Sequence, residues 1–145
     1  MYRALVLFSL TICISTISHA QSQNREEAER QAREVISNFF EAFNTENHTR
    51  LASLSHYPSV LLGDGGGMRV NNEPFEIDFD SLRKREDWKH SELDTMNSVF
   101  TLTDKVHMLV RFTRYNSSGE GYSQIDGLWI LTKQNGKWGV SARSY

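Results

Sequence analysis

Two runs of alternating apolar residues within 128–142 constrain the fold more than any other part of the sequence. They flank Asn135-Gly136, the dipeptide that best accepts the positive φ angles of a type I′ hairpin turn. In the register that this turn sets, Trp129 lies opposite Ala142. One side of the predicted hairpin then carries the apolar residues Trp129, Leu131, Trp138, Val140 and Ala142.

A second hairpin, with its loop at 116–121, adds apolar residues to the same side. Counting from this loop places Phe112 opposite Ile125 and Met108 opposite Trp129. A slip of one residue in either turn would spread the apolar residues over both sides, so the agreement of two independent turns supports the register. We name this side the apolar face. The opposite side, named the mixed face, carries His107, Leu109, Arg111, Thr113, Gln124, Asp126, Leu128, Ile130, Ser141 and Arg143.

A third strand is predicted at 91–102, and the tight turn after it places Asp94 opposite Arg114 on the apolar face. His90 lies beside this pair, so polar groups converge at one end of an apolar surface. Such an arrangement is typical of a small-molecule pocket. An exposed cross-strand ion pair at the fraying end of the sheet explains the pattern equally well.

Residues 1–20 have the features of a secretory signal peptide. One positive charge, Arg3, precedes an apolar run at 4–17, and Ser18-His19-Ala20 supplies small residues at the two positions that a signal peptidase reads. We therefore predict cleavage and export to the periplasm or the extracellular space. The apolar run is too short to span a bilayer comfortably, so no stable membrane insertion is expected after cleavage.

The remaining residues, 21–145, are enough for one domain with a core of its own. The only cysteine, Cys13, leaves with the signal peptide, so no disulfide or thiolate site is expected. The sequence has 16 basic and 18 acidic residues, of which only Arg3 lies in the signal peptide, which leaves a net charge of about −3. This charge argues against electrostatic binding of nucleic acid.

Residues 21–44 are predicted to form a long amphipathic helix that is capped by Asn24. Phe39 and Phe43 lie in its apolar stripe, where they either cover the sheet or form the wall of a pocket. A second helix, at 80–89, carries charges of both signs and is expected to lie in solvent.

No cofactor or metal ion is predicted. The glycine-rich segment 63–67 lacks the Gly-Lys-Ser/Thr of a P-loop, and extended chain instead of a helix follows it. We interpret this segment as a hairpin turn or a pocket rim. The histidines of the domain are too scattered to indicate a metal site: His48, His56, His90 and His107.

A long helix, a short strand pair and a long antiparallel meander follow one another along the chain. This order, with FFEAFN at 39–44 and LWILTKQNGKWGVSARS at 128–144, resembles the nuclear-transport-factor-2-like (NTF2-like) superfamily, which includes SnoaL-like polyketide cyclases, ketosteroid isomerase and scytalone dehydratase. The resemblance implies an α+β fold in which a curved antiparallel sheet wraps around the helix and encloses an apolar pocket. Many members form dimers through the outer sheet face, so a homodimer through the mixed face is expected. The implied pocket residues are Phe39, Phe43, Tyr57, Met96, Phe112 and Trp129.

The isomerases and dehydratases of this superfamily place a carboxylate in an apolar cavity, where burial tunes its strength as an acid or a base. By this resemblance Asp94 is the candidate base and His90 a proton shuttle, and Tyr57 or Arg114 would stabilise an oxyanion. A partner as close as Arg114 would, however, keep Asp94 a weak base.

Three functions stay open at this point. The domain binds a small apolar or amphipathic molecule, or it is a cofactor-free isomerase, dehydratase or cyclase, or it binds a protein partner through the mixed face. The absence of a recognisable catalytic motif favours the first and the third.

Overall fold

A computed structural model describes residues 3–74 and 76–145, with their side chains from residue 21 onward. The predicted signal peptide, residues 1–20, lies outside the residues whose side chains are described. Over the described part of the chain, no helix combines the length and the apolar character that crossing a membrane requires.

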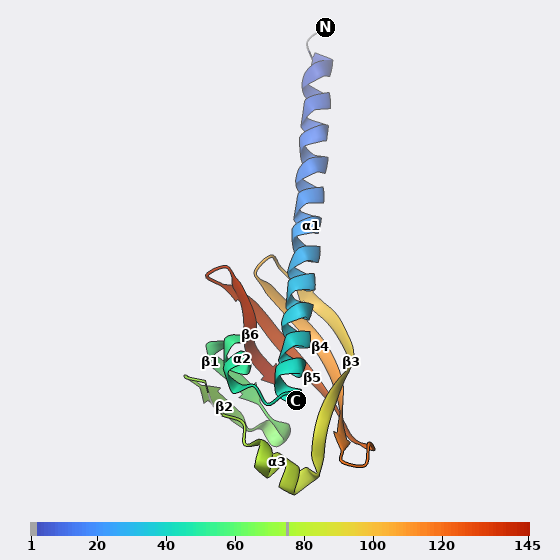
Figure 1. Cartoon of the computed structure of the whole chain (residues 1–145). Coiled ribbons are helices and arrows are strands. Elements are labelled where there is room, and N and C mark those ends of the chain that lie inside the picture. The colour runs from blue at the N-terminus through green and yellow to red at the C-terminus, as the bar shows by residue number, and fades with distance from the viewer. Residues whose placement is uncertain (1–2, 75) are drawn as a thin grey trace.

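Helices and short elements come first in the chain, and four long strands follow. The elements are α1 (Arg3–Asn44), α2 (His48–Ser53), β1 (Ser55–Leu62), the 3-10 turn η1 (Asp64–Gly66), β2 (Met68–Asn71), α3 (Phe79–Glu86), β3 (Trp88–Thr101), β4 (Lys105–Asn116), β5 (Gly121–Gln134) and β6 (Lys137–Ser144). The strands form one sheet in the order β2-β1-β6-β5-β4-β3, in which only β1 and β6 run parallel. This sheet curves around α1 (Figure 1). The predicted α+β fold is confirmed.

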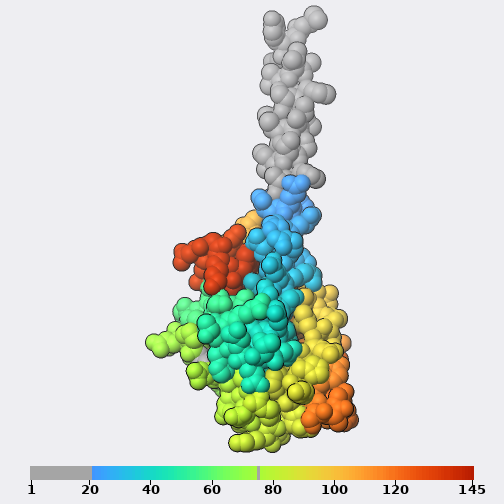
Figure 2. All heavy atoms as spheres, in the orientation of Figure 1, coloured from blue at the N-terminus to red at the C-terminus, as the bar shows by residue number. Residues whose placement is uncertain are grey.

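Helix α1 lies against the concave side of the sheet because one stripe of it is apolar. Figure 2 shows its C-terminal half between the red β5–β6 hairpin and the yellow strand β3. The opposite stripe is held by ion pairs one turn apart, such as Arg30 with Glu27 and Glu34. The predicted cap at Asn24 is wrong, because α1 is continuous through this residue. The buried stripe consists of Ala28, Ala32, Val35, Ile36, Phe39, Phe40 and Ala42.

Aromatic side chains from α1 and the sheet form the centre of the core. Trp129 is only 1% exposed, and its ring lies 5.1 Å from that of Phe39 and 5.8 Å from that of Phe40. Phe40 also meets Phe112 edge to face at 5.1 Å. Contacts of this kind add about 0.5 to 1.5 kcal/mol per pair to the free energy gained by burying the rings. These ring contacts therefore join α1 to β4 and β5.

The predicted register is confirmed between Met108 and Phe112 of the β4–β5 hairpin, and from the turn to Val140 in the β5–β6 hairpin. Phe112 pairs with Ile125 across β4 and β5, and Gln134 pairs with Lys137 across β5 and β6. Beyond Val140, however, Ser141 is an extra residue on β6, so that Trp129 pairs with Arg143 and not with Ala142. A bulge of this kind turns every following side chain to the other face. Arg143 therefore lies on the apolar face, and its predicted place on the mixed face is wrong.

The predicted register of β3 against β4 is wrong. The turn closes through a hydrogen bond of 2.8 Å from Leu102 N to Lys105 O, so that Thr101 instead of Leu102 pairs with Val106. Three further irregularities shift the pairing along β3. As a result Ser91, and not Asp94, lies opposite Arg114.

The convex side of the sheet is the mixed face. Apolar side chains are exposed there, among them Val99, Phe100 and Leu109, the last of which is 50% exposed. Charged residues lie beside them, including the pair of Arg111 and Asp126. The homodimer expected through this face stays a prediction.

Candidate functional site

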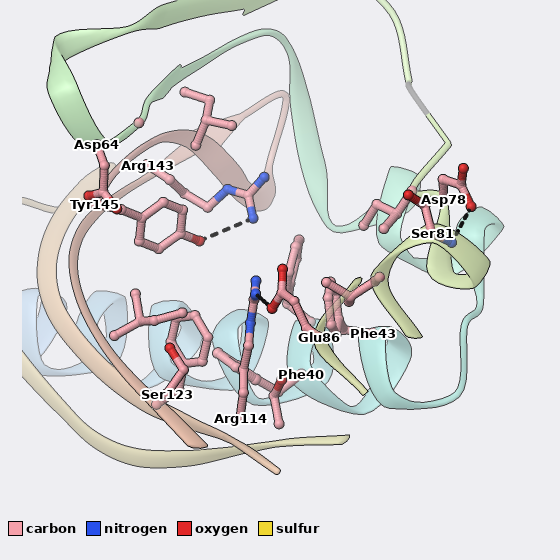
Figure 3. A pocket seen from close by; sticks show the side chains of 18 of the residues that line it. Phe40, Phe43, Asp64, Asp78, Ser81, Glu86, Arg114, Ser123, Arg143 and Tyr145 are labelled. Atoms are coloured by element: carbon pink, nitrogen blue, oxygen red, sulfur yellow. Dashed lines mark hydrogen bonds and ion pairs between the residues drawn. The ribbon is translucent and has the colours of Figure 1, made fainter. Parts of the chain in front are cut away.

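A cavity of about 730 Å³ lies between helix α1, helix α3, the β1–β2 loop and the concave side of the sheet (Figure 3). Its apolar wall comes from phenylalanines of α1 and from the apolar face of β4 and β5. Its rim comes from exposed polar residues, among them Asp64 and Asp78. The glycine-rich segment 63–67 is the loop of the β1–β2 hairpin, closed by a hydrogen bond of 2.8 Å from Gly63 N to Gly67 O. The segment is thus both a hairpin turn and part of the cavity rim, as predicted.

Four of the six predicted pocket residues line this cavity, namely Phe39, Phe43, Phe112 and Trp129. Tyr57 and Met96 do not. Met96 pairs with Val110 because of the shifted register of β3, and it packs at the edge of the core.

One polar cluster of the site joins α3 to the sheet. Helix α3 begins at the cap Asp78, whose carboxylate accepts a hydrogen bond of 2.8 Å from Ser81 N, and Glu86 is its last residue. Arg114 of β4 donates from Nη1 to Glu86 Oε2, and the hydroxyl of Tyr122 donates to the same oxygen over 3.1 Å. Burial, together with this hydrogen bond, raises the pKa of Tyr122 above its ordinary value of 10.0.

Two buried N–H groups of cavity-lining residues lack an acceptor within the described part of the chain. They are Arg114 Nε and Trp129 Nε1. A buried donor without a partner costs about 1 to 3 kcal/mol, so such groups normally meet a water molecule or a ligand. Both residues line the cavity, which has room for either.

Arg143 brings a second guanidinium into the cavity. Its Nη1 donates to the hydroxyl of Tyr145 over 3.3 Å, and its Cζ lies 5.1 Å from the ring centre of Phe39 and 5.3 Å from that of Trp129. Within the described residues it forms no ion pair with a carboxylate. Figure 3 shows the guanidinium groups of Arg143 and Arg114 pointing into the cavity from two sides.

Gly127 makes room for Tyr145 at the end of β6. A Cβ atom at Gly127 would lie only 2.8 Å from Tyr145 Cδ1 and 2.8 Å from Ser144 O. The ring of Tyr145 instead fills this place and meets the rings of Phe112 at 6.2 Å and Trp129 at 6.5 Å. A glycine inside a strand is the one sequence signal that could have pointed to this close approach.

Solved structures of similar shape identify the fold. An NTF2-like protein of unknown function from Pseudomonas putida is similar at a TM-score of 0.66 and 11% identity, covering 82% of this chain and 85% of its own. The fold is NTF2-like. No protein-family model and no curated protein matches the sequence.

Two further structures with this NTF2-like fold carry the names of enzymes. The LinA type 2 hexachlorocyclohexane dehydrochlorinase is similar at a TM-score of 0.58 and 14% identity, over 85% of this chain and 86% of its own. A putative scytalone dehydratase from Novosphingobium aromaticivorans is similar at 0.60 and 9% identity, over 85% of each chain. At such identities the likeness establishes the fold and not the activity.

The structure does not bring the three predicted catalytic residues together in the NTF2-like cavity. Only Arg114 lines it. Asp94 is exposed on the mixed face, where it accepts a hydrogen bond of 2.8 Å from Thr113 Oγ1. His90 is stacked on Tyr115 at 4.9 Å on that same face. The prediction that Asp94 and His90 meet Arg114 is wrong, because the irregularities of β3 turn them outward.

Sequence reasoning missed Glu86, Tyr122, Arg143 and Tyr145. Glu86 lies in a run of mixed charges from which no residue stands out. Arg143 was assigned to the opposite face, since nothing in the sequence marks the bulge at Ser141. Among the described residues of the NTF2-like domain, no three His, Cys, Asp or Glu side chains are grouped so that they could hold a metal ion.

Proposed function

We propose that the domain binds a small molecule with an apolar body and a hydrogen-bond acceptor in its cavity. The observation that carries this proposal is a cavity with an aromatic wall, two of whose lining residues, Arg114 and Trp129, each keep a buried N–H group without an acceptor among the described residues. An acceptor on a ligand would recover the hydrogen bonds that these groups lose by being buried.

The size and the lining of the cavity support the same proposal. A volume of about 730 Å³ lies within the usual range for small-molecule sites. Aromatic walls favour flat apolar groups, and a few polar groups at fixed positions give orientation. Helix α1 and the sheet hold these walls in place, because the same aromatic residues form the core.

A second candidate function is a cofactor-free elimination or dehydration. Glu86 lines the cavity, and the two hydrogen bonds that it accepts both go to Oε2. Among the described residues, its other oxygen, Oε1, is paired only with Arg85, at 3.7 Å, and could receive a proton from a substrate. A Glu86→Gln variant would then lose all turnover of a substrate while it still bound that substrate.

Calorimetric titration with 2-naphthamide tests the binding proposal, because this uncharged molecule has an apolar body and a carbonyl acceptor. We expect one site per chain. Ile125→Trp should remove it, because Ile125 lines the cavity. Leu128→Trp, on the mixed face, is the matched control and should bind as the wild type does. Equal binding by both variants, or none by the wild type, would contradict the proposal, as would native mass spectra that show no ligand on protein purified under mild conditions.

A further inference from the structure

The two guanidinium groups that point into the cavity differ in their partners. Arg114 forms an ion pair with Glu86. Arg143 has no carboxylate partner within the described residues, although it lines the same cavity. Its positive charge is therefore available to a ligand.

The surroundings of Arg143 leave its N–H groups available. The rings of Phe39, Trp129 and Tyr145 lie 5.1 to 5.9 Å from its Cζ and act on the π faces of the guanidinium. A guanidinium has five N–H donors along its edges, and only Nη1 donates to a described residue, over the long distance of 3.3 Å. The remaining donors form the planar fork that suits a carboxylate.

Resting on the proposed function, we infer that the ligand is a flat apolar molecule whose carboxylate binds the guanidinium of Arg143. Trp129 is the cross-strand neighbour of Arg143, and its Nε1 has no acceptor among the described residues. The aromatic walls then receive the apolar body. Arg114 Nε, on the other side of the cavity, is the donor for any second polar group (Figure 3).

A matched pair of probes tests this inference, 2-naphthoate and 2-naphthamide, which have nearly the same shape and differ in charge. We expect the wild type to bind 2-naphthoate about ten- to a hundredfold more tightly, as hydrogen bonds to charged groups allow. Arg143→Met should bind both probes with equal affinity. Arg143→Lys keeps the charge without the fork and should retain part of the preference. Arg111→Met, on the mixed face, should behave as the wild type.

The outcomes separate this inference from the proposed function. Equal binding of both probes by the wild type would overturn the inference and leave the proposed function standing. Binding of neither probe would overturn the proposed function itself. A preference that survives Arg143→Met and disappears in Arg114→Met would assign the anion to the other arginine, and so would also overturn the inference. Circular dichroism and thermal unfolding of each variant establish that it is folded. If Arg143→Met does not fold, the relative affinity of the wild type for the two probes tests the inference.

Discussion

Two arginines of strand β4, three residues apart, show how differently the two faces of the sheet are completed. Arg111, on the mixed face, is 46% exposed and donates two hydrogen bonds, of 2.7 and 2.9 Å, to Asp126. Arg114, on the apolar face, pairs with Glu86 but keeps a buried Nε without an acceptor in the described chain. On the outer face the guanidinium is thus paired by a neighbouring side chain. On the inner face one buried N–H of Arg114 has no acceptor among the described residues.

The carboxylates follow the same division. Asp94 on the mixed face lies in solvent beside Thr113 and Gln124. Glu86 on the inner side lies in the cavity and bridges Arg114 and Tyr122. The carboxylate that lines the cavity is therefore on α3 and not on β3, where the alternation of residues placed it.

The largest difference between the faces should appear in a pair of truncations. Trp129→Ala removes the most central aromatic side chain of the core and is expected to lower the free energy of unfolding by about 3 to 5 kcal/mol. Leu109→Ala, on the mixed face, should change it by about 0.5 kcal/mol or less, since Leu109 is half exposed. Urea unfolding of both variants measures these values. Equal losses would show that the outer face is buried in solution.

Two glycine-to-alanine substitutions compare a crowded position, Gly127, with an open one, Gly67. Gly127→Ala brings a methyl group within 2.8 Å of Tyr145 and Ser144, and the displacement should cost about 1 to 3 kcal/mol of stability. Gly67→Ala has no atom within 4 Å of the new methyl group and a φ of −65°, so it should be close to neutral. Thermal unfolding checks both. A neutral Gly127→Ala would mean that Tyr145 does not pack over this strand.

Removing either arginine of β4 should sharpen the contrast between them. Arg114→Met leaves Glu86 half-buried without its cation, and we expect a loss of about 1 to 2 kcal/mol. Arg111→Met breaks an exposed pair, which is worth under about 1 kcal/mol. Salt at 0.5 M screens exposed pairs. Chemical unfolding at this concentration should therefore reduce the loss caused by Arg111→Met more than the loss caused by Arg114→Met. The reverse order would refute the difference in environment.

The smallest effect concerns His107 on the mixed face. Burial, and then the charge of Lys105, lower the pKa of His107 below its ordinary value of 6.5. The unfolded chain therefore binds a proton more readily than the folded one, so stability should decrease slightly as the pH falls through 6.5. A nuclear magnetic resonance titration of the imidazole measures this pKa directly. Lys105→Gln should raise it, and an unchanged value would mean that Lys105 does not act on the ring.

The difference between the faces also explains what the sequence could predict. The turn at Asn135-Gly136 has a strong local code, and the pairing next to it came out as expected. Bulges have no comparable code, because an extra residue is accepted wherever packing rewards the bend. Met108 and Phe112 were placed correctly because β4 and β5 pair without interruption between them, whereas the bulge at Ser141 displaced Arg143. Glu86 could not be found at all, since only the burial of Phe79 and Leu82 decides which side of α3 faces inward.

The extra residue at Ser141 has a consequence for anyone who compares this chain with its relatives. In a regular strand, side chains two positions apart lie on the same face. The bulge instead places Val140 and Arg143, three positions apart, on the same face. A relative that lacks the insertion would carry its counterpart of Arg143 one place earlier, and a gapless alignment would match it with an outward-pointing alanine. Such an alignment would then show a difference in the charged lining of the cavity where there is none. Positions at this end of β6 should be matched through their pairing with Trp129 on the neighbouring strand.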